Sequence, residues 1–224
     1  MRLIAQVCVA GLLLTGALLV FGARAKERKL LPVDEGVRDP SFKAFRDGLL
    51  EALRRRDKKF VLSILDPKIR LSFGDDSGVE DFKKYWKIES ANSELWDELS
   101  TVLSLGGTFD TSGGQRLFCA PYTYSRFPED LDAFEYAPIT GKDVRVRARP
   151  GASSRVVATL SYSIVRAEFS GTDGGRSSGW VKIVTPDGKP GYVSDKYIRS
   201  PVDYRACFRK ARGKWLMTLF VAGD

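Results

Sequence analysis

The chemistry that this sequence offers begins with two cysteines, Cys119 and Cys207, which lie 88 positions apart. Each lies in a run of residues typical of a β-strand. In an oxidising compartment they could form one disulfide, and closing a loop of that size stabilises a fold by about 4–5 kcal/mol in the chain-entropy model. The alternative is a pair of buried free thiols. The third cysteine, Cys8, lies in an apolar N-terminal segment, where we interpret it as a packing residue.

Histidine is absent from all 224 residues, which excludes Ser-His-Asp and Cys-His catalysis and every histidine-ligated metal site. Two acidic clusters remain as candidates for metal binding or acid–base catalysis. We interpret the first as a turn followed by a helix start, because its spacing differs from that of a calcium loop, and the second as an acidic connection. The two clusters are Asp75, Asp76, Glu80 and Asp81, and Glu129, Asp130, Asp132 and Glu135. We therefore expect no metal, no cofactor and no enzymatic activity.

The secondary-structure elements that position the cysteines and acidic clusters can be predicted from the sequence, and the first is a helical region. Apolar residues recur at helical spacing from about Ser41 to Leu65, which predicts one amphipathic helix or two, with Asp39 as the N-cap. The segments that follow alternate between strand and helix patterns. The expected elements are strands at 68–73, 108–109 and 115–121, and helices at 79–88 and 93–105.

The chain ends in two strand patterns, 204–210 and 214–221, joined at Gly213. A lone two-stranded hairpin is too small to be stable, so we expect it to complete a sheet begun by the N-terminal part of the chain. The sequence therefore predicts an α+β fold with a small all-β barrel inserted into it. The expected boundaries are a signal peptide at 1–25, a linker at 26–39, an α+β domain at 40–136 plus 201–224, and the inserted module at 137–200.

The N-terminal segment has the layout of a secretory signal peptide. Arg2 precedes an apolar run from Leu3 to Gly22, and the small residues of Ala23-Arg24-Ala25 predict cleavage after residue 25. The run is also long enough to remain as a membrane anchor, and more basic residues follow it than precede it. We expect a periplasmic or otherwise exported protein, anchored to the membrane only if this segment is retained.

The net charge of +8 is unevenly distributed along the chain. Residues 61–141 carry 7 basic and 14 acidic residues, or −7, whereas residues 142–224 carry 16 and 7, or +9. This asymmetry indicates an anionic partner for the C-terminal part, or charge pairing between the two parts; the alternative is a solvated mixed surface. The basic residues are not interleaved with aromatic residues in the manner of an RNA-binding surface, so we expect no nucleic-acid partner.

Several motifs in the inserted module resemble those of bacterial Src-homology-3 domains. The run Val144-Arg145-Val146-Arg147-Ala148-Arg149-Pro150 is similar to the first strand of that family. Later segments, at 179–184 and 191–194, are similar to a strand pair of the family, and Asp187-Gly188 between them predicts a tight hairpin turn. The resemblance covers roughly 60 residues and implies a small β-barrel.

The flanking parts resemble the nuclear-transport-factor-like cone fold in the order of their elements. The resemblance rests on the leading helices, the turn at Gly74-Asp75-Asp76-Ser77-Gly78 and the closing Gly213-Lys214-Trp215-Leu216 strand. It departs from that fold in having the insertion. Enzymes of this fold differ in which pocket residues act, so no catalytic residue can be transferred to this chain.

The Src-homology-3 resemblance implies a binding function, directed at a cell-wall polymer such as peptidoglycan or at an envelope protein. Aromatic rings can stack on sugars or peptides, and guanidinium groups can bind carboxylates. The alternative for Trp180 and Tyr192 is packing in the core or at its rim. The candidate ligand-binding residues are Tyr162, Trp180, Tyr192, Tyr197, Arg147, Arg149 and Arg155.

A second hypothesis places function in the cone-like domain, as a periplasmic small-ligand-binding protein or an enzyme with an aromatic pocket. The alternative for these aromatic residues is a role in the hydrophobic core. The candidate pocket residues are Phe73, Tyr85, Trp86, Trp96 and Trp215.

Overall fold

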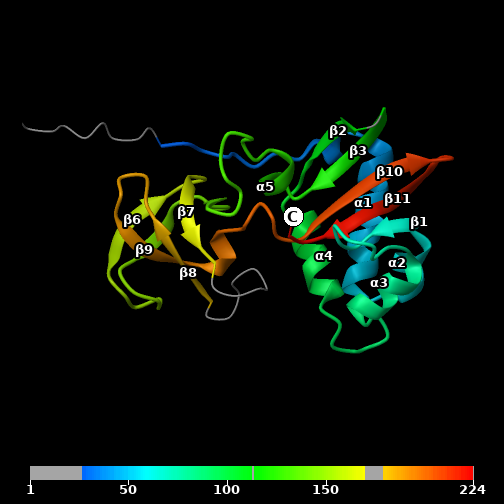
Figure 1. The fold of residues 1–224 in the computed structure, drawn as a ribbon, viewed down its shortest axis with the longest axis horizontal. Helices are drawn as coiled ribbons and strands as arrows, with labels where there is room; N and C mark the ends of the chain where they lie inside the picture. Colours follow the sequence, from blue (N-terminus) through cyan, green and yellow to red (C-terminus); the bar gives the residue numbers. More distant parts are fainter. Residues whose placement is uncertain (1–26, 113, 170–178, 224) are drawn as a thin grey trace, which may run out of the picture.

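The computed structural model describes residues 27–112, 114–169 and 179–223. The predicted signal segment, with Cys8, lies outside the described residues. The chain has a mixed α+β fold with two separate sheets, as predicted. Figure 1 shows the six-stranded sheet at the left and the five-stranded sheet with its helices at the right. Within the described ranges, no helix is both long and apolar enough to cross a membrane.

The helical region near the N-terminus consists of two helices. The Asp39 carboxylate accepts hydrogen bonds from the backbone N–H groups of Ser41 and Phe42, which confirms it as the N-cap of the first helix. Asp57 caps the second helix through the N–H of Phe60. The bounds are η1 (Glu35–Arg38), α1 (Pro40–Arg54), α2 (Lys58–Ser63), α3 (Val79–Trp86), α4 (Leu95–Ser104) and α5 (Tyr122–Ser125).

The five-stranded sheet has the strand order β1-β11-β10-β3-β2. The C-terminal hairpin of β10 and β11 takes the central places, which confirms that the tail completes a sheet begun before the inserted module. β11 pairs in parallel with β1, and the other pairs are antiparallel. The strands are β1 (Leu65–Arg70), β2 (Thr108–Ser112), β3 (Gln115–Ala120), β10 (Arg205–Ala211) and β11 (Lys214–Val221).

Strand β1 lies three residues earlier than the alternation pattern predicted. The N–H of Leu71 donates to the carbonyl oxygen of Asp76 at 3.1 Å, and the N–H of Gly78 donates to that of Ile69 at 2.8 Å. These bonds close a turn immediately after the strand. The prediction extended the strand too far because Ile69 and Leu71 are both buried, and burial continues past the end of the sheet pairing.

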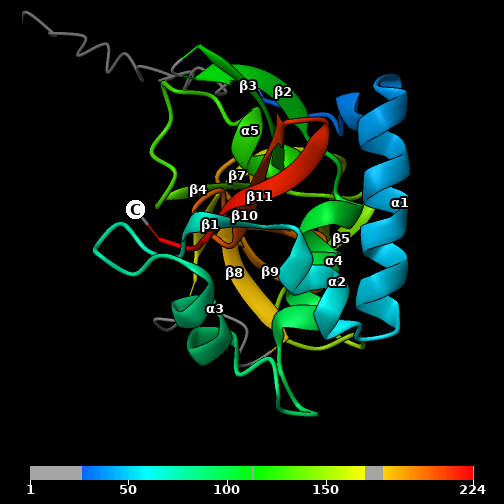
Figure 2. The same cartoon turned by 90° about the vertical axis from the view of Figure 1, so that its right-hand side faces the viewer.

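Phe42 occupies the centre of the core between α1 and the five-stranded sheet. Its side chain is fully buried, and its ring centroid lies 4.1 Å from that of Phe118 in β3 and 4.9 Å from that of Trp215 in β11. Figure 2 shows α1 running alongside this sheet. Leu49 and Leu53 follow Phe42 at helical spacing on the same buried face, as the amphipathic pattern predicted.

The six-stranded sheet forms the inserted all-β module and has a hydrophobic core of its own. Its strand order is β4-β7-β8-β9-β5-β6, and the strand pairs among the described residues do not join β4 to β6. Alternate residues point inward, such as Val181 and Ile183 in β8. The elements are β4 (Tyr136–Pro138), β5 (Val144–Arg147), β6 (Val156–Leu160), β7 (Ile164–Glu168), β8 (Trp180–Val184), β9 (Pro190–Ser194) and η3 (Asp195–Tyr197).

The segment expected to be a linker, residues 26–39, makes ordered contacts where it is described. The N–H of Leu30 donates to the carbonyl oxygen of Tyr162, and the N–H of Ile164 donates to that of Arg28, both at 2.8 Å. The segment therefore pairs with the inserted module through an isolated antiparallel β-bridge between Lys29 and Ser163. Its sequence gave no sign of this, because the pairing uses backbone groups that every residue carries.

A third hydrophobic cluster lies where the two parts of the molecule meet. It contains Leu30 of the N-terminal segment, Tyr122 of α5 and Ile164 of β7, all buried. Burial raises the pKa of the Tyr122 hydroxyl to about 12. The contact between the two parts thus includes apolar packing as well as backbone pairing.

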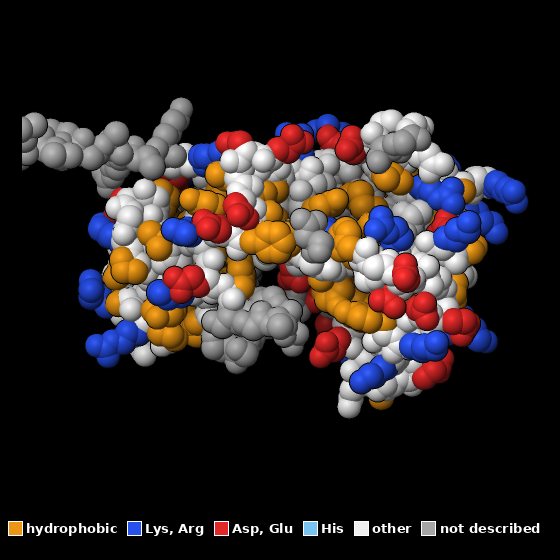
Figure 3. Space-filling view, in the orientation of Figure 1, with side chains coloured by type: hydrophobic (Ala, Val, Ile, Leu, Met, Phe, Trp, Pro, Cys, Tyr) orange, Lys and Arg blue, Asp and Glu red, His pale blue; other side chains and the backbone are white. Residues whose placement is uncertain are grey.

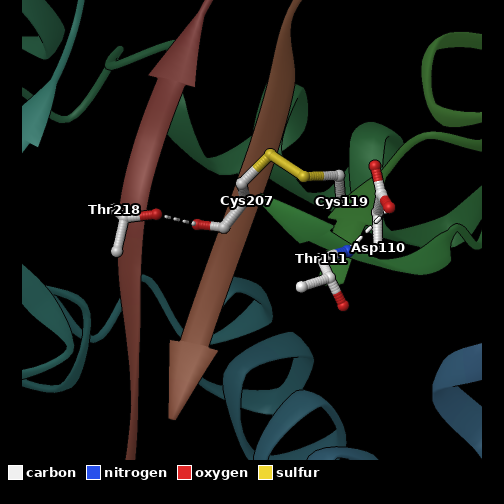
Figure 4. Close-up of a disulfide and its surroundings, with 5 residues drawn as sticks. All are labelled: Asp110, Thr111, Cys119, Cys207 and Thr218. Atoms are coloured by element: carbon white, nitrogen blue, oxygen red, sulfur yellow. Dashed lines mark hydrogen bonds between the residues drawn. A yellow bond between two sulfur atoms is a disulfide. The ribbon is translucent and has the colours of Figure 1, made fainter. Parts of the chain in front are cut away.

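Cys119 and Cys207 lie directly opposite each other in β3 and β10 and form a disulfide with an S–S distance of 2.02 Å (Figure 4). This confirms the predicted bridge, and the alternative of two free thiols is wrong. The Thr218 hydroxyl donates to the carbonyl oxygen of Cys207 at 3.2 Å. The disulfide joins the last strand before the inserted module to the first strand after it.

Candidate binding surface

The outward face of the six-stranded sheet carries a row of four side chains that crosses four neighbouring strands. The strand register places Glu168 of β7 opposite Lys182 of β8. Tyr192 of β9 lies opposite both Lys182 and Arg147 of β5. Because the neighbours of these residues along β5, β8 and β9 are buried, the row points away from the core. We call Glu168, Lys182, Tyr192 and Arg147 the outer row.

The outer row sets an aromatic ring between two cations. Lys182 Nζ lies 3.0 and 2.9 Å from Oε1 and Oε2 of Glu168, and this carboxylate raises the pKa of Lys182. On the other side of Tyr192, one terminal nitrogen of Arg147 donates to the carbonyl oxygen of Ser154 at 2.7 Å. That bond fixes the guanidinium group and uses one of its five donors. A half-buried ring flanked by cations can stack on an apolar face and bind an anion beside it.

Two further arginines flank the turn between β5 and β6. The backbone N–H of Arg149 donates to Ser154 Oγ at 3.0 Å, and the carbonyl oxygen of Arg155 accepts from the N–H of Ala148 at 2.9 Å. Both side chains are exposed, and neither forms an ion pair with an acidic side chain among the described residues. Their donors are therefore available to carboxylate or phosphate groups of a ligand.

Trp180 lies on the same outward face as the outer row. It opposes Ser194 in β9, which makes it a diagonal neighbour of Tyr192 across the β8–β9 pair. Trp180 and Tyr192 are both half-buried, a position at the rim of the core. The predicted residues Trp180, Tyr192 and Arg147 are thus brought onto one face, with Arg149 and Arg155 at the adjoining turn.

The family comparison agrees with this architecture. The stretch from residue 142 to residue 199 matches the model of the family described as "Bacterial SH3 domain". Residues 142–199 form a bacterial SH3 domain. The match begins two residues before β5 and ends just after η3, so it contains the outer row and both turn arginines.

Two other comparisons concern the whole chain. No curated protein matches it. Among solved structures it is similar to a chain whose title begins Rd1NTF2_05, at 13% sequence identity and a TM-score of 0.30, over 81% of this chain and 95% of that one.

The structure places Tyr162 and Tyr197 away from the outer row of the SH3 domain. The N–H of Tyr162 donates to the carbonyl oxygen of Gly141 at 3.1 Å, and the carbonyl oxygen of Tyr197 accepts from Thr140 at 2.9 Å. Both tyrosines therefore flank the segment that leads into the domain. Tyr162 also binds the N-terminal segment through its backbone, so its position is set by that contact.

Sequence reasoning did not single out Lys182, although a signal for it exists. Lys182 follows Trp180 by two positions in the same strand, and residues two apart in a strand share a face. The same rule relates Arg145, which is exposed, to Arg147. If we had applied this two-residue spacing to the named aromatic residues, it would have identified the cations that flank them.

The aromatic residues proposed for a pocket in the α+β domain do not line a common cleft. Trp86, Trp96 and Trp215 are buried in the core, and the ring of Trp86 stacks on another core ring at a centroid distance of 4.8 Å. Phe73 and Tyr85 lie on the surface, with 45% and 56% of their areas exposed. These placements agree with the alternative reading of the three tryptophans as core residues.

The two acidic clusters also take the structural roles expected from the sequence. In the first, Glu80 and Asp81 lie in the opening turn of α3 and form ion pairs with Lys83 and Lys84. In the second, Asp130 forms an ion pair with Arg28, and the Arg28 guanidinium lowers the pKa of the Asp130 carboxyl. This second cluster thereby helps hold the N-terminal segment.

Proposed function

We propose that this protein is an exported, non-enzymatic protein of the cell envelope whose SH3 domain binds a wall polymer, peptidoglycan, or an envelope protein. The observation that carries the proposal is the outer row, in which Tyr192 lies between Lys182 and Arg147. Arg149 and Arg155 extend the cationic surface at the next turn. Sugar rings stack on aromatic faces, and guanidinium groups bind the carboxylates of peptides.

Two features support export. The first is the predicted signal segment at residues 1–25. The second is the disulfide between Cys119 and Cys207, because such bonds form and persist in oxidising compartments and are rare in the cytosol. Peptidoglycan and the envelope proteins that act on it are found in that same environment.

The test is co-sedimentation of the chain from residue 26 onward with purified peptidoglycan at low and moderate salt. A first variant, Tyr192→Ala, removes the ring at the centre of the outer row. A second, Arg149→Gln with Arg155→Gln, removes two cations at the turn. A matched control, Arg54→Gln with Lys59→Gln, removes two cations from the exposed helical surface of the α+β domain.

We expect both SH3 variants to pellet less than the wild-type protein, and the control variant to pellet equally well. Binding should also weaken as salt rises, because exposed charges are screened. If the wild type and both SH3 variants pelleted equally, the outer row would be excluded as the binding site. An absence of pelleting by the wild-type protein would reject peptidoglycan and leave an envelope protein as the partner to be tested.

A further inference from the structure

A cleft of about 240 Å³ opens at the end of the five-stranded sheet beside the N-terminus of α1. It lies where β10 turns into β11, and Figure 1 shows this hairpin end pointing away from the SH3 domain. Cationic side chains dominate its walls. The lining residues are Asp39, Gln115, Arg116, Arg209, Lys210 and Trp215.

The side chains of the cleft are held in place by contacts with one another and with α1. One terminal nitrogen of Arg116 lies 2.9 Å from Asp39 Oδ2, and its guanidinium carbon lies 3.7 Å from the ring centroid of Phe109. Lys210 Nζ and Trp215 Nε1 both donate to Ser41 Oγ, at 3.0 and 3.2 Å. The cleft is therefore preorganised, which reduces the entropic cost of binding a ligand.

The cations of the cleft keep unused hydrogen-bond donors. Arg116 has five N–H donors and Lys210 has three, and the bonds just described use one donor of each. Arg209 forms an ion pair with Asp66 through one of its terminal nitrogens. By contrast, the Asp39 carboxylate is already bound by Arg116 and by three donors of α1, so it does not compete for a further cation.

The turn next to the cleft adds positive charge that nearby acids do not neutralise. The segment 209–214 holds four basic residues and no acidic residue. Arg212 and Lys214 are exposed and form no ion pair with an acidic side chain in the described part of the chain. Figure 3 shows Lys and Arg side chains gathered at this end of the molecule. Such a field raises the local concentration of anions.

We propose that this cleft binds a phosphate group of an anionic ligand, at a surface separate from the SH3 domain. Arg116 and Arg209 keep donors beyond their ion pairs with Asp39 and Asp66, and the Lys210 ammonium group adds a cation. Together these donors suit a phosphate group, which offers several acceptor oxygens. Guanidinium forks match phosphate oxygens in bidentate geometry. The Trp215 ring and the Gln115 amide form the rest of the wall, where the organic part of the ligand would lie.

The test uses the indole N–H signal of Trp215 in a two-dimensional ¹H–¹⁵N NMR spectrum of the protein from residue 26 onward. The probe is inorganic phosphate at constant ionic strength, with acetate as the carboxylate control. The cleft variant is Arg116→Gln with Lys210→Gln, and the rim variant is Arg212→Gln with Lys214→Gln. The matched control is again Arg54→Gln with Lys59→Gln, which also removes two cations.

We expect a saturable shift of the Trp215 signal with phosphate, and a dissociation constant about tenfold higher in the cleft variant. The rim variant, whose changes are at exposed positions, should weaken binding by a smaller factor of about threefold. The control variant should bind as the wild type does. Equal losses in all three variants, or an equal response to acetate, would overturn a phosphate site.

A second arm distinguishes the source of the phosphate. Vesicles of phosphatidylglycerol are compared with vesicles of phosphatidylcholine in a flotation assay with the wild-type protein and the cleft variant. Flotation only with phosphatidylglycerol, lost in the cleft variant, would assign the site to a lipid surface. A Trp215 shift with soluble phosphate alone would assign it to a soluble phosphorylated ligand. No response in either arm would reject the proposal, whatever the result with peptidoglycan.

Discussion

Arg199 and Glu98 form an ion pair between the end of the SH3 domain and helix α4, with a terminal guanidinium nitrogen 2.9 Å from Oε1 of the carboxylate. Only 6% and 5% of the two side chains is exposed. The same guanidinium group lies 3.5 Å from the Asp203 carboxylate and donates to the carbonyl oxygen of Tyr204 at 2.9 Å. This network connects the inserted domain to the domain that contains it.

Replacing Arg199 with Met should lower the free energy of unfolding by about 3–5 kcal/mol, because it removes one partner of a buried ion pair. Glu98→Gln should cost less, since Asp203 still balances the guanidinium charge. Urea denaturation followed by circular dichroism measures both values. A loss below about 1 kcal/mol for Arg199→Met would show that solvent reaches this ion pair.

Removing the disulfide should destabilise the protein by about 4–5 kcal/mol, the entropy of closing a loop of this length in the unfolded chain. Cys119→Ser with Cys207→Ser tests this, and reduction of the wild-type protein should give a similar loss. The measurement is urea denaturation with and without dithiothreitol. The double variant itself should not respond to the reductant, which makes it the control. An unchanged midpoint on reducing the wild type would contradict the expectation.

Gly107 should not tolerate a side chain, because a Cβ atom there would lie 2.1 Å from the carbonyl oxygen of Cys119. Gly107→Ala forces β2 and β3 apart, and we expect a loss of at least about 2 kcal/mol. The matched control is Gly48→Ala in the middle of α1, where the nearest atom is Phe60 Cζ at 3.7 Å. That change should stabilise the protein by about 0.5–1 kcal/mol. The measurement is the melting temperature of each variant relative to the wild type. Shifts in the same direction for Gly107→Ala and Gly48→Ala would contradict the structure.

Acid should weaken the N-terminus of α1. The Ser41 hydroxyl, the N–H of Phe42 and the Arg116 guanidinium hold the pKa of Asp39 at about 2. An aspartate in the unfolded chain has a pKa near 3.9, so the stabilisation is fully present above about pH 4 and is lost as the pH falls towards about 2. Asp39→Asn keeps a good N-cap but cannot titrate. The unfolding free energy of this variant should therefore depend less steeply on pH over that range than that of the wild type.

The sequence was sufficient to predict features that depend on local chemistry. Asp39 before Pro40 predicted a helix start, the alternation around Val144 and Trp180 predicted strands, and the tail hairpin predicted an insertion. In the first two cases neighbouring residues determine the conformation, and in the third the instability of a lone hairpin requires a sheet for it to join. The possible pairing of Cys119 with Cys207 followed from the cysteine count and the expected oxidising compartment, and the structure decided it against two free thiols.

The sequence patterns could not predict features that depend on tertiary contacts. The backbone pairing of Leu30 with Tyr162 leaves no mark in either residue. Arg199 and Glu98 resemble ordinary surface charges until the fold buries them together. The cationic cleft draws on Arg116 and Lys210 from strands that are 94 positions apart in sequence, brought close only by the sheet.

The central position of β10 and β11 also has a consequence for the order of folding. All strands of the SH3 domain are supplied by one continuous segment. By contrast, β3 can pair with β2 at once, but the partner of its other edge, β10, is synthesised only after that whole segment. We expect the SH3 domain to fold first and, by bringing its two ends together, to shorten the effective loop that the larger sheet must close. Until β10 pairs with it, β3 keeps one unpaired edge, and a folded SH3 domain shortens the later part of this interval by holding the two chain ends close together.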